Sequence, residues 1–563
     1  MSFYEKYILP RFLNCACASK PITHQRKKVT PFAEGKILEV GIGSGLNLPY
    51  YNKSKIEELW GIDPSEELNV MAKKVAIQEG IDVKFLSSSA EDIPLPNDYF
   101  DTVLITYTMC TIPEVIKANK EIKRVLKDDG KMIFCEHGIS PDENIKKWQG
   151  RINSFWGRIA GGCNINRDIP ELIKTSGFKI INKLDLMSEE ELLDPSVSAK
   201  KLLNGNRAFY YDLYDPPFYI LSRYDDINNA LRDPDTFLEG YGNGPNFINS
   251  NGIVSDGDHH TFIRRIVQPN FLMGSIRNLE NRLEEITDDL LNDVNNRDIW
   301  DIHDDLSFPL PVIIICEILG VPTDDIKKFK GWADAAVAQM CSEEPETFDK
   351  ELDKMNDYFL LLINKKRSVP EDESLISKIA NSKINDKYLS DDEAVLLIKQ
   401  IFVAGNETTT SLISNLVWRM LSIDNLWEDF VNDRLEIDGL ISESLRYDPP
   451  LLGLFKTTSR DVTYDNITIP SNTKVMMHYG AANRDSEIFD NPNKFDSTRD
   501  GKKVISFSVG IHICLGRELA KLETRVALRA LRKKFPNLRL INNGQRVGPF
   551  LFWGRSKLPV SHN

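Results

Sequence analysis

The sequence pattern changes near residue 188, and this change constrains the fold more than any other feature. Before it, apolar strand-like segments alternate with helical segments. After it, long helical patterns dominate and the strand-like segments are short. The 563 residues also exceed the ~250–300 residues at which a single hydrophobic core stops growing. We therefore expect two domains, residues 1–188 and residues 189–563.

The first part of the chain predicts an α/β domain. Its strand-like segments lie at residues 36–43, 58–63, 83–90, 101–108, 131–138 and 178–187. An amphipathic helix is predicted over 116–130, where Gly130 stops it. Strands separated by helices favour a parallel, doubly wound, Rossmann-like sheet. The second part predicts a mainly α fold with small β-sheets, including strands at 217–223 and 473–480.

Acidic residues outnumber basic ones, 83 to 70, which gives a net charge of −13. Such a surface argues against nucleic acid or an anionic membrane as the main partner. The most apolar run, 308–322, contains Glu317 and is shorter than the ~20 apolar residues of a membrane span, so we expect a buried helix there. Pro10, Arg11 and Asn14 interrupt any signal-peptide pattern. We therefore expect a soluble, cytoplasmic protein.

The eight cysteines are scattered along the chain. No CxxC occurs, and the neighbouring Cys15 and Cys17 have no ligand group with zinc spacing beside them. In a chain this long, so few cysteines do not form a disulfide framework. Cysteine spacing therefore predicts neither a disulfide scaffold nor a zinc site.

A glycine-rich turn follows the first predicted strand. Gly41, Gly43 and Gly45 have GxGxG spacing, which differs from the GxGxxG of a dinucleotide fingerprint. Glycines here let the backbone turn tightly and approach a ligand at the carboxyl edge of the sheet. Asp63 ends the second predicted strand, where a carboxylate binds ribose hydroxyls and repels a phosphate. The combination disfavours NADP and predicts another ribose-containing cofactor.

The turn, Asp63 and the segments 90–96 and 99–101 resemble the class I S-adenosylmethionine-dependent methyltransferases. The resemblance implies a methyltransferase fold with S-adenosyl-L-methionine as cofactor. The residues that it places around the cofactor are Glu39, Gly41, Gly43 and Gly45 beside the methionine moiety, Asp63 on the ribose, and Ala90 and Glu91 beside the adenine.

Segments 135–138 and 161–168 resemble the thiol-methyltransferase-like branch of the type 11 methyltransferases. Methyl transfer from a sulfonium needs an aligned acceptor, and it needs a base only when the acceptor is an alcohol or a thiol. His137 ends a predicted strand at the ligand edge and is a candidate for that base; a structural role is the alternative. Cys163, in a predicted loop, is expected to be structural. Ser89 stands where many relatives have an acidic residue, which raises the alternative of a non-catalytic binding or docking domain.

The most specific motif of the second part is the loop 507–516, which contains Cys514. A helical pattern follows at once, so Cys514 lies at a helix N-terminus, where backbone N–H groups and the helix dipole lower the pKa of a thiol. Gly510 and Gly516 remove side chains where a flat macrocycle would press on the loop. A lone cysteine is usually a small buried hydrophobic residue, but the ten-residue pattern is far more specific than a lone cysteine.

This loop resembles the haem-binding loop of the cytochrome P450 family, of the soluble bacterial type, and the similarity extends from residue 190 almost to the C-terminus. The resemblance implies a haem b monooxygenase of mainly α fold in which Cys514 is the iron ligand. Glu443 and Arg446, one helical turn apart, and the later Arg499 match the structural triad of the family.

One predicted helix spans 391–423 and carries Gly405, Glu407 and Thr408 near its middle. Glycine and threonine are poor helix formers, costing up to ~1 kcal/mol each relative to alanine. Such a conflict indicates either a functional site or a tolerated kink with the threonine bonded back to the previous turn. By the P450 resemblance, Glu407 and Thr408 match the acid–alcohol pair that delivers protons to bound dioxygen.

Four basic residues match the contacts to the haem propionates in the same family, namely His260, Arg264, Lys456 and His512. Hydrogen bonds from cationic donors to a carboxylate are stronger than neutral ones. Lys456 stands where relatives usually carry arginine, so it keeps the charge without the fork geometry.

The two parts together predict a bifunctional tailoring enzyme. Its haem monooxygenase would oxidise a small organic molecule with O2, and its methyltransferase would methylate a small molecule. No flavin or iron–sulfur segment is recognisable, so we expect electrons from separate partners, a ferredoxin and a reductase. A haem-based sensor is a further alternative, which the Glu407–Thr408 pair disfavours because a sensor needs no proton delivery.

Overall fold

The computed structural model describes residues 17–140, 143–180, 194–212, 214–323, 326–384 and 387–562. Chain contacts divide the protein into two compact units, Met1–Asp185 and Leu186–Asn563. The expected domain boundary at residue 188 lies outside the described residues. Of the strand expected at 178–187, the first three residues are not in a strand, and the others lie outside the described residues.

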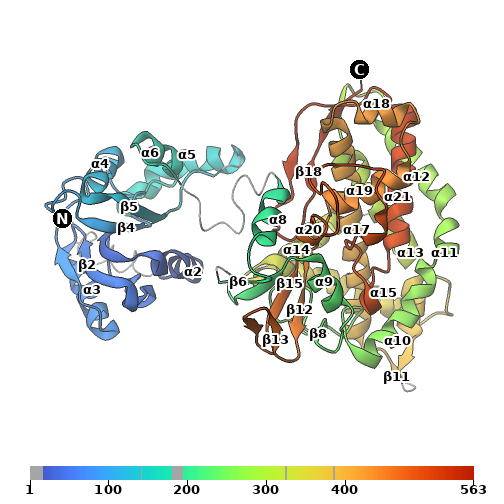
Figure 1. Cartoon of the computed structure of the whole chain (residues 1–563), viewed down its shortest axis with the longest axis horizontal. Coiled ribbons are helices and arrows are strands. Elements are labelled where there is room, and N and C mark those ends of the chain that lie inside the picture. The colour runs from blue at the N-terminus through green and yellow to red at the C-terminus, as the bar shows by residue number, and fades with distance from the viewer. Residues whose placement is uncertain are drawn as a thin grey trace. The chain divides into compact units, whose positions relative to one another are not determined.

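The N-terminal unit is built on a parallel sheet with the strand order β3–β2–β1–β4–β5 (Figure 1). Its strands are β1 (Gly35–Val40), β2 (Ile56–Ile62), β3 (Lys84–Leu86), β4 (Phe100–Thr106) and β5 (Leu126–Cys135). The chain builds outward from β1 to β3 and then returns to place β4 on the other side of β1. The strand order therefore reverses between β1 and β4, and this place is called the switch point of the sheet. Sheets of this kind bind ligands at the switch point, outside the carboxyl ends of the strands. The predicted Rossmann-like α/β fold is confirmed.

Helices pack on both faces of this sheet. They are α2 (Lys20–Val29), α3 (Glu66–Glu79), α4 (Val115–Val125), α5 (Glu143–Ile159) and α6 (Ile169–Thr175). Neighbouring residues of β1 point to opposite faces: Ile37 shares a core cluster with Ala72 of α3, whereas Leu38 shares another with Ile122 of α4. Because successive side chains of a strand alternate between faces, α3 and α4 cover opposite sides of the sheet.

The helix expected over 116–130 is shorter than predicted, because α4 ends at Val125. Leu126 is extended and buried, and it pairs with Phe100 as the first residue of β5. Sheet pairing and burial of the leucine outweigh the helical pattern of the residues that follow. Gly130 therefore lies inside β5 and does not end a helix.

The C-terminal unit is mainly helical, and residues of α17 (Asp391–Ser422) run through its largest core cluster. Ser390 and Glu393 form a capping box that starts this helix. The other helices are α8 (Pro195–Leu203), α9 (Tyr224–Leu231), α10 (Gly257–Val267), α11 (Met273–Arg277), α12 (Glu280–Val294), α13 (Pro309–Leu319), α14 (Ile326–Cys341), α15 (Asp349–Arg367), α16 (Leu375–Asn381), α18 (Leu426–Val431), α19 (Ile437–Tyr447), α20 (Tyr479–Ala482) and α21 (Arg517–Lys534).

Small sheets accompany these helices, as predicted. The largest has the order β6–β7–β15–β12–β8, and the strands expected at 217–223 and 473–480 are β7 and β15, which pair in parallel. Its strands are β6 (Ala208–Tyr211), β7 (Phe218–Leu221), β8 (Phe237–Leu238), β12 (Leu454–Thr458) and β15 (Lys474–Met477). The remaining strands are β9 (Ile299–Asp301), β10 (Lys383–Ile384), β11 (Lys387–Tyr388), β13 (Val462–Tyr464), β14 (Ile467–Ile469), β16 (Arg539–Leu540), β17 (Gln545–Arg546), β18 (Arg555–Lys557) and β19 (Pro559–Ser561).

The apolar run at 308–322 forms α13, most of which is buried in the core, as expected. Gly320 ends this helix with a φ of 79°, a left-handed conformation that favours glycine. Among the described residues, no helix combines the length and the apolar character needed to cross a bilayer.

Arg446 of α19 is completely buried and is held by a set of hydrogen bonds. Its Nε and Nη2 donate to the two carboxylate oxygens of Glu443 at 2.8 and 2.7 Å. Its Nη1 donates to the backbone carbonyls of Asn483 at 2.9 Å and Pro492 at 2.8 Å. Arg499 Nε lies 3.4 Å from Glu443 Oε1. The buried pair thus fixes α19 to a distant segment of backbone.

We expect Arg446→Lys to destabilise the C-terminal unit, because lysine keeps the charge but loses the fork that makes these bonds. The loss of even one buried hydrogen bond to a charged group costs about 1.5–3 kcal/mol. Urea unfolding followed by circular dichroism measures the effect. Arg434→Lys is the matched control, since exposed Arg434 bonds Asp429 at 2.8 Å on the surface. Equal changes in the free energy of unfolding of the two variants would contradict the role of the hydrogen bonds of Arg446.

Candidate functional site

The turn after β1 has a backbone that only glycine adopts readily. Gly41, Gly43 and Gly45 have φ values of 71°, 54° and 83°. A Cβ on Gly41 would lie 2.3 Å from side-chain atoms of Thr108. A Cβ on Gly43 would have only one backbone atom nearby, at 3.9 Å. The turn is therefore tight at Gly41 and open at Gly43, where a ligand can approach the backbone.

Glu39 of β1 is buried just before this turn and is fully hydrogen-bonded. Its two carboxylate oxygens accept from Asn47 Nδ2 and Tyr51 Oη, each at 2.8 Å. Arg26 Nη1 donates in turn to Asn47 Oδ1 at 2.9 Å and to Thr106 Oγ1 at 2.5 Å. Burial raises the pKa of Glu39 to about 7. The network holds this carboxyl group rigidly beside the turn.

Asp63 follows β2 and contacts the glycine turn directly. Gly43 N donates to its Oδ2 at 3.0 Å, and Ser65 N donates to its Oδ1 at 2.9 Å. Burial raises the pKa of Asp63, while these two backbone donors act in the opposite direction. Each carboxylate oxygen retains further acceptor capacity for a ligand hydroxyl. The carboxyl ends of β1 and β2 are thereby joined around one carboxylate.

Ala90 and Glu91 lie in the loop that follows β3, at the same carboxyl edge of the sheet. Ala90 is buried. The Oε1 of Glu91 accepts from Glu114 N at 2.7 Å, and its Oε2 accepts from Ser89 Oγ at 3.1 Å. The loops after β1, β2 and β3 thus offer a glycine turn and two carboxylates along one edge. This arrangement fits a nucleoside cofactor with a ribose.

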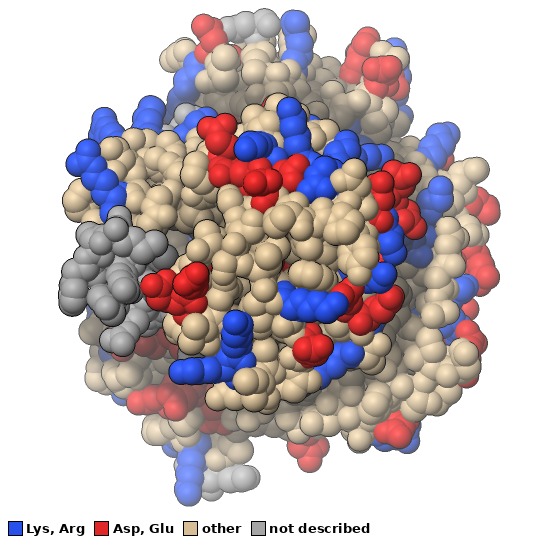
Figure 2. Space-filling model, turned by 90° about the vertical axis from the view of Figure 1, so that its left-hand side faces the viewer, with Lys and Arg blue, Asp and Glu red and all other residues tan. Residues whose placement is uncertain are grey.

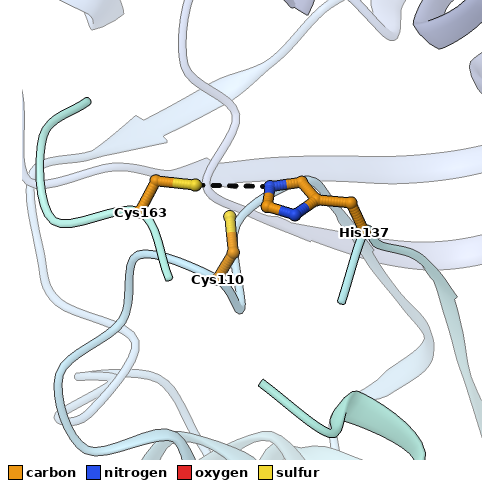
Figure 3. Close-up of side chains that lie close together, drawn as sticks. All are labelled: Cys110, His137 and Cys163. Carbon is orange, nitrogen blue, oxygen red and sulfur yellow. Dashed lines mark hydrogen bonds between the residues drawn. The ribbon is translucent and has the colours of Figure 1, made fainter. Parts of the chain in front are cut away.

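His137 lies two residues beyond β5, and its Nε2 is 3.3 Å from Cys163 Sγ (Figure 3). Cys110, in the loop after β4, completes a group whose nitrogen and sulfur atoms all lie within 4.8 Å of one another. Cys110 and Cys163 are both buried. The candidate base therefore contacts a cysteine that is distant in sequence.

One face of the molecule, drawn in Figure 2, carries lysine and arginine interspersed with aspartate and glutamate. Uncharged residues form a broad area between them. Among the described residues visible there, neither sign of charge forms a continuous stripe.

Cys514 lies between a short 3-10 turn, Gly510–His512, and the start of α21. Its side chain is accessible, yet burial raises the pKa of the thiol. The N–H groups of Gly516 and Arg517 and the charge of Arg264 lower this pKa by less than burial raises it. The backbone N–H groups thus act in the expected direction, but burial outweighs them and the pKa of the free thiol is raised. Metal coordination deprotonates a thiol directly.

Two of the four predicted propionate contacts, Lys456 and His512, pair with Glu239. Lys456 Nζ donates to Glu239 Oε1, and His512 Nδ1 lies 3.2 Å from Glu239 Oε2. The rings of His260 and His512 have centroids 4.2 Å apart. Arg264 Nη2 donates to the backbone carbonyl of the residue after His512, at 2.7 Å. Segments far apart in the sequence thus form one basic cluster.

The two histidines of this cluster are neutral hydrogen-bonding groups. Burial lowers the pKa of His260, and burial together with the charge of Lys456 lowers that of His512 to about 2. The Nε2 atom of each ring is buried and has no hydrogen-bond partner in the part of the chain that the structure describes. An unpaired buried polar atom is costly, so each of the two favours a polar ligand group beside it. The cluster therefore offers polar groups to the propionates of a haem, with positive charge supplied by Arg264, because Lys456 is paired with Glu239.

Glu407 and Thr408 lie in the middle of α17, which continues through them without interruption. Thr408 Oγ1 donates to the backbone carbonyl of Ala404 at 2.8 Å. Ala404 is exposed, although most residues of α17 are buried. Glu407 is only 8% exposed, and its Oε1 has no hydrogen-bond partner among the described residues. Burial raises the pKa of Glu407 to about 7, and Asp334 acts in the same direction. A buried acid that holds its proton near neutral pH thus lies beside an alcohol.

Two residues at these sites were not identified from the sequence. Glu239 is a single glutamate in a loop segment, and nothing in the sequence indicates that it reaches Lys456 and His512. Cys110 has no ligand spacing to His137, so only the fold brings the two together. Contacts over such separations leave no local sequence pattern.

Family models match both units. Residues 432–540 match the family described as Cytochrome P450, and residues 38–134 match the family described as Methyltransferase domain. The first family implies haem iron, and the second implies S-adenosyl-L-methionine.

Curated relatives of the second unit are bacterial cytochromes P450. Cytochrome P450 107B1 of Saccharopolyspora erythraea is 32% identical over 61% of this chain and 88% of its own length. Erythromycin C-12 hydroxylase of the same organism is 32% identical, with 60% of this chain and 87% of that protein covered. Vitamin D(3) 25-hydroxylase of Pseudonocardia autotrophica is 33% identical, with 58% of this chain and 83% of that protein covered. These relatives support monooxygenase activity.

Solved structures show the same relationship. A mutant of P450 EryK in complex with erythromycin B is 28% identical, with a TM-score of 0.60 and with 65% of this chain and 95% of that chain covered. CYP109E1 from Bacillus megaterium in complex with testosterone is 28% identical, with a TM-score of 0.61 and with 67% of this chain and 100% of that chain covered. The loop around Cys514, the relatives and these structures agree: the chain belongs to the cytochrome P450 family and carries an additional methyltransferase domain.

Proposed function

We propose that the chain is a bifunctional tailoring enzyme, in which residues 189–563 oxidise a small organic molecule with O2 and residues 1–188 transfer a methyl group from S-adenosyl-L-methionine. The observation that carries the methyl-transfer half is the hydrogen bond from Gly43 N to Asp63 Oδ2 at 3.0 Å. It holds the glycine turn and the carboxylate together before any cofactor binds, which reduces the ordering cost of binding. The names of the relatives, which include hydroxylases of erythromycin and vitamin D(3), favour a bulky natural product as the oxidation substrate.

The oxidation half depends on iron held by Cys514, and the haem would supply the activation of dioxygen. Arg264 would neutralise charge on its propionates, and Lys456, His260 and His512 would contact them. Glu407 would hold a proton, and Thr408, whose hydroxyl hydrogen is directed to a backbone carbonyl, would present its lone pairs to that proton. Bacterial P450 enzymes use separate redox proteins, and we propose a ferredoxin and a reductase as the electron source here.

A mass-spectrometric screen tests both halves. The purified chain is incubated with metabolite extract, isotope-labelled dioxygen, a surrogate ferredoxin–reductase pair and methyl-labelled S-adenosyl-L-methionine. We expect products that gain labelled oxygen and products that gain a labelled methyl group. Oxygen incorporation without methyl incorporation would favour a non-catalytic N-terminal domain, the alternative that Ser89 raises.

The first prediction concerns the iron ligand. The reduced carbon monoxide complex of the purified protein should show the red-shifted Soret band of a thiolate ligand, and Cys514→Ser should lose it. Cys341→Ser, a partly exposed cysteine of α14 in the same unit, is the control and should retain the band. Retention of the band in Cys514→Ser would refute the assignment.

The second prediction concerns proton delivery by Glu407. Its pKa is raised from 4.5 to about 7, so the group is protonated below that pH and loses its proton as the pH rises through it. The fraction of electrons that end in product should therefore be highest below about pH 7 and fall above it. In Glu407→Gln, the fraction of electrons that end in product should be low at every pH and should no longer depend on pH.

A companion variant separates the two members of the pair. Thr408→Ala leaves the acid in place, so it should lower coupling and raise hydrogen peroxide release while keeping the pH dependence. Electron consumption, product and hydrogen peroxide are measured together. A Glu407→Gln protein with the wild-type pH profile would show that another group holds the proton.

The third prediction concerns Asp63. Asp63→Asn should weaken the binding of S-adenosyl-L-methionine roughly 10–150-fold, because a hydrogen bond to a charged group contributes about 1.5–3 kcal/mol. Isothermal titration calorimetry measures the affinity, and the haem spectrum should not change. Asp82→Asn, at an exposed carboxylate just before β3, is the control. Equal affinity in Asp63→Asn and Asp82→Asn would remove Asp63 from the ribose site.

A further inference from the structure

Two cysteines and a histidine converge in the N-terminal unit (Figure 3). Cys163 Sγ and His137 Nε2 are 3.3 Å apart, and Cys110 Sγ lies within 4.8 Å of both. Cys110 follows β4 and His137 follows β5, so both lie at the carboxyl edge of the sheet. Cys163 comes from the loop after α5. Three separate segments thus direct one nitrogen and two sulfur atoms into the same small volume.

The ligand atoms and their separations suit a zinc ion. Thiolate and imidazole are the groups that zinc binds most often in proteins. At the usual bond lengths, ligand atoms around a tetrahedral zinc lie about 3.6–3.8 Å apart. The observed separations, 3.3 Å for one pair and no more than 4.8 Å for the others, require only small rotations of the side chains to reach that geometry.

The loop that carries Cys110 is held in place without help from its thiol. The Oε1 of Glu136 accepts from Thr108 N at 2.6 Å and from Met109 N at 2.8 Å. Arg167 Nη1 donates to the carbonyls of Met109 and Ile112, the latter at 2.6 Å. The backbone on both sides of Cys110 is therefore fixed by groups that are not ligands.

The segments around His137 and Cys163 are tied to the same loop. Asn164 N donates to the carbonyl of Cys110 at 2.8 Å. Ile139 N donates to the carbonyl of Arg167 at 2.8 Å. A Cβ on Gly138 would lie 2.6 Å from that same carbonyl, so the close approach beside His137 needs glycine. The three ligands are thus pre-positioned, which is the property that makes a metal site tight and selective.

We propose that Cys110, His137 and Cys163 bind one zinc ion through Sγ, Nε2 and Sγ. Three protein ligands leave the fourth tetrahedral position to water or to an exogenous ligand. Binding deprotonates both thiols, and the released protons pass to the solvent. Zinc on Nε2 takes the atom of His137 that faces Cys163, so under this proposal His137 is a ligand and not a free base.

The metal content of the full-length, haem-loaded, reduced protein tests the site. After incubation with zinc sulfate and gel filtration, elemental analysis should give one zinc per chain in addition to the haem iron. Cys110→Ser and Cys163→Ser should weaken zinc binding by more than roughly 100-fold in competition with a chromophoric chelator, since even changes to groups that only hydrogen-bond a metal ligand cost about 10–100-fold. Cys135→Ser is the matched control in β5, two residues before His137, and should bind as the wild type does.

X-ray absorption at the zinc edge of the wild-type protein gives a readout that does not depend on how well the variants fold. We expect two sulfur ligands and two lighter ones. Zinc without sulfur ligands, equal retention by Cys110→Ser, Cys163→Ser and Cys135→Ser, or no zinc retained by the reduced wild type would each overturn the proposal. The last result would leave a hydrogen-bonded thiol–imidazole cluster. None of these measurements needs S-adenosyl-L-methionine or a methyl acceptor, so their outcome is independent of the proposed function.

Discussion

Both units obey one constraint: a charged or polar group removed from water must be given partners or must lose its charge. Arg446 is completely buried and donates to a carboxylate and to backbone carbonyls. Glu39 has a donor on each carboxylate oxygen. The pKa of Glu39 and that of Glu407 are both raised to about 7, and Glu407 differs because one of its oxygens has no partner among the described residues. An unsatisfied buried acid is costly to stability, yet it is suited to hold a proton near neutral pH.

In the N-terminal unit, the direction of the strands decides what comes together. All five strands are parallel, so every loop at their carboxyl ends lies along the same edge. The glycine turn, Asp63 and Glu91 follow β1, β2 and β3, whereas Cys110 and His137 follow β4 and β5. The topology that assembles a cofactor site on one side of the switch point therefore assembles the proposed zinc ligands on the other.

Local sequence patterns predicted most of the elements and failed where distant contacts decide. The helix predicted over 391–423 is α17, Asp391–Ser422, because its capping box lies within four consecutive residues. The helix predicted over 116–130 ends early, because Leu126 pairs with Phe100 in the sheet. The first prediction rests on neighbours in the sequence, and the second would have required knowledge of the strand order.

The sequence by itself determined the two-part organisation, the Rossmann-like sheet and the loop that carries Cys514. Each is expressed in short-range patterns of apolar residues, glycines and caps, which act before distant segments meet. Only the tertiary structure decided the raised pKa of the Cys514 thiol, the place of Glu239 among the basic residues, and the meeting of Cys110 with Cys163. Desolvation depends on everything packed around a group, and contacts between distant segments depend on strand order, so neither leaves a pattern in the local sequence.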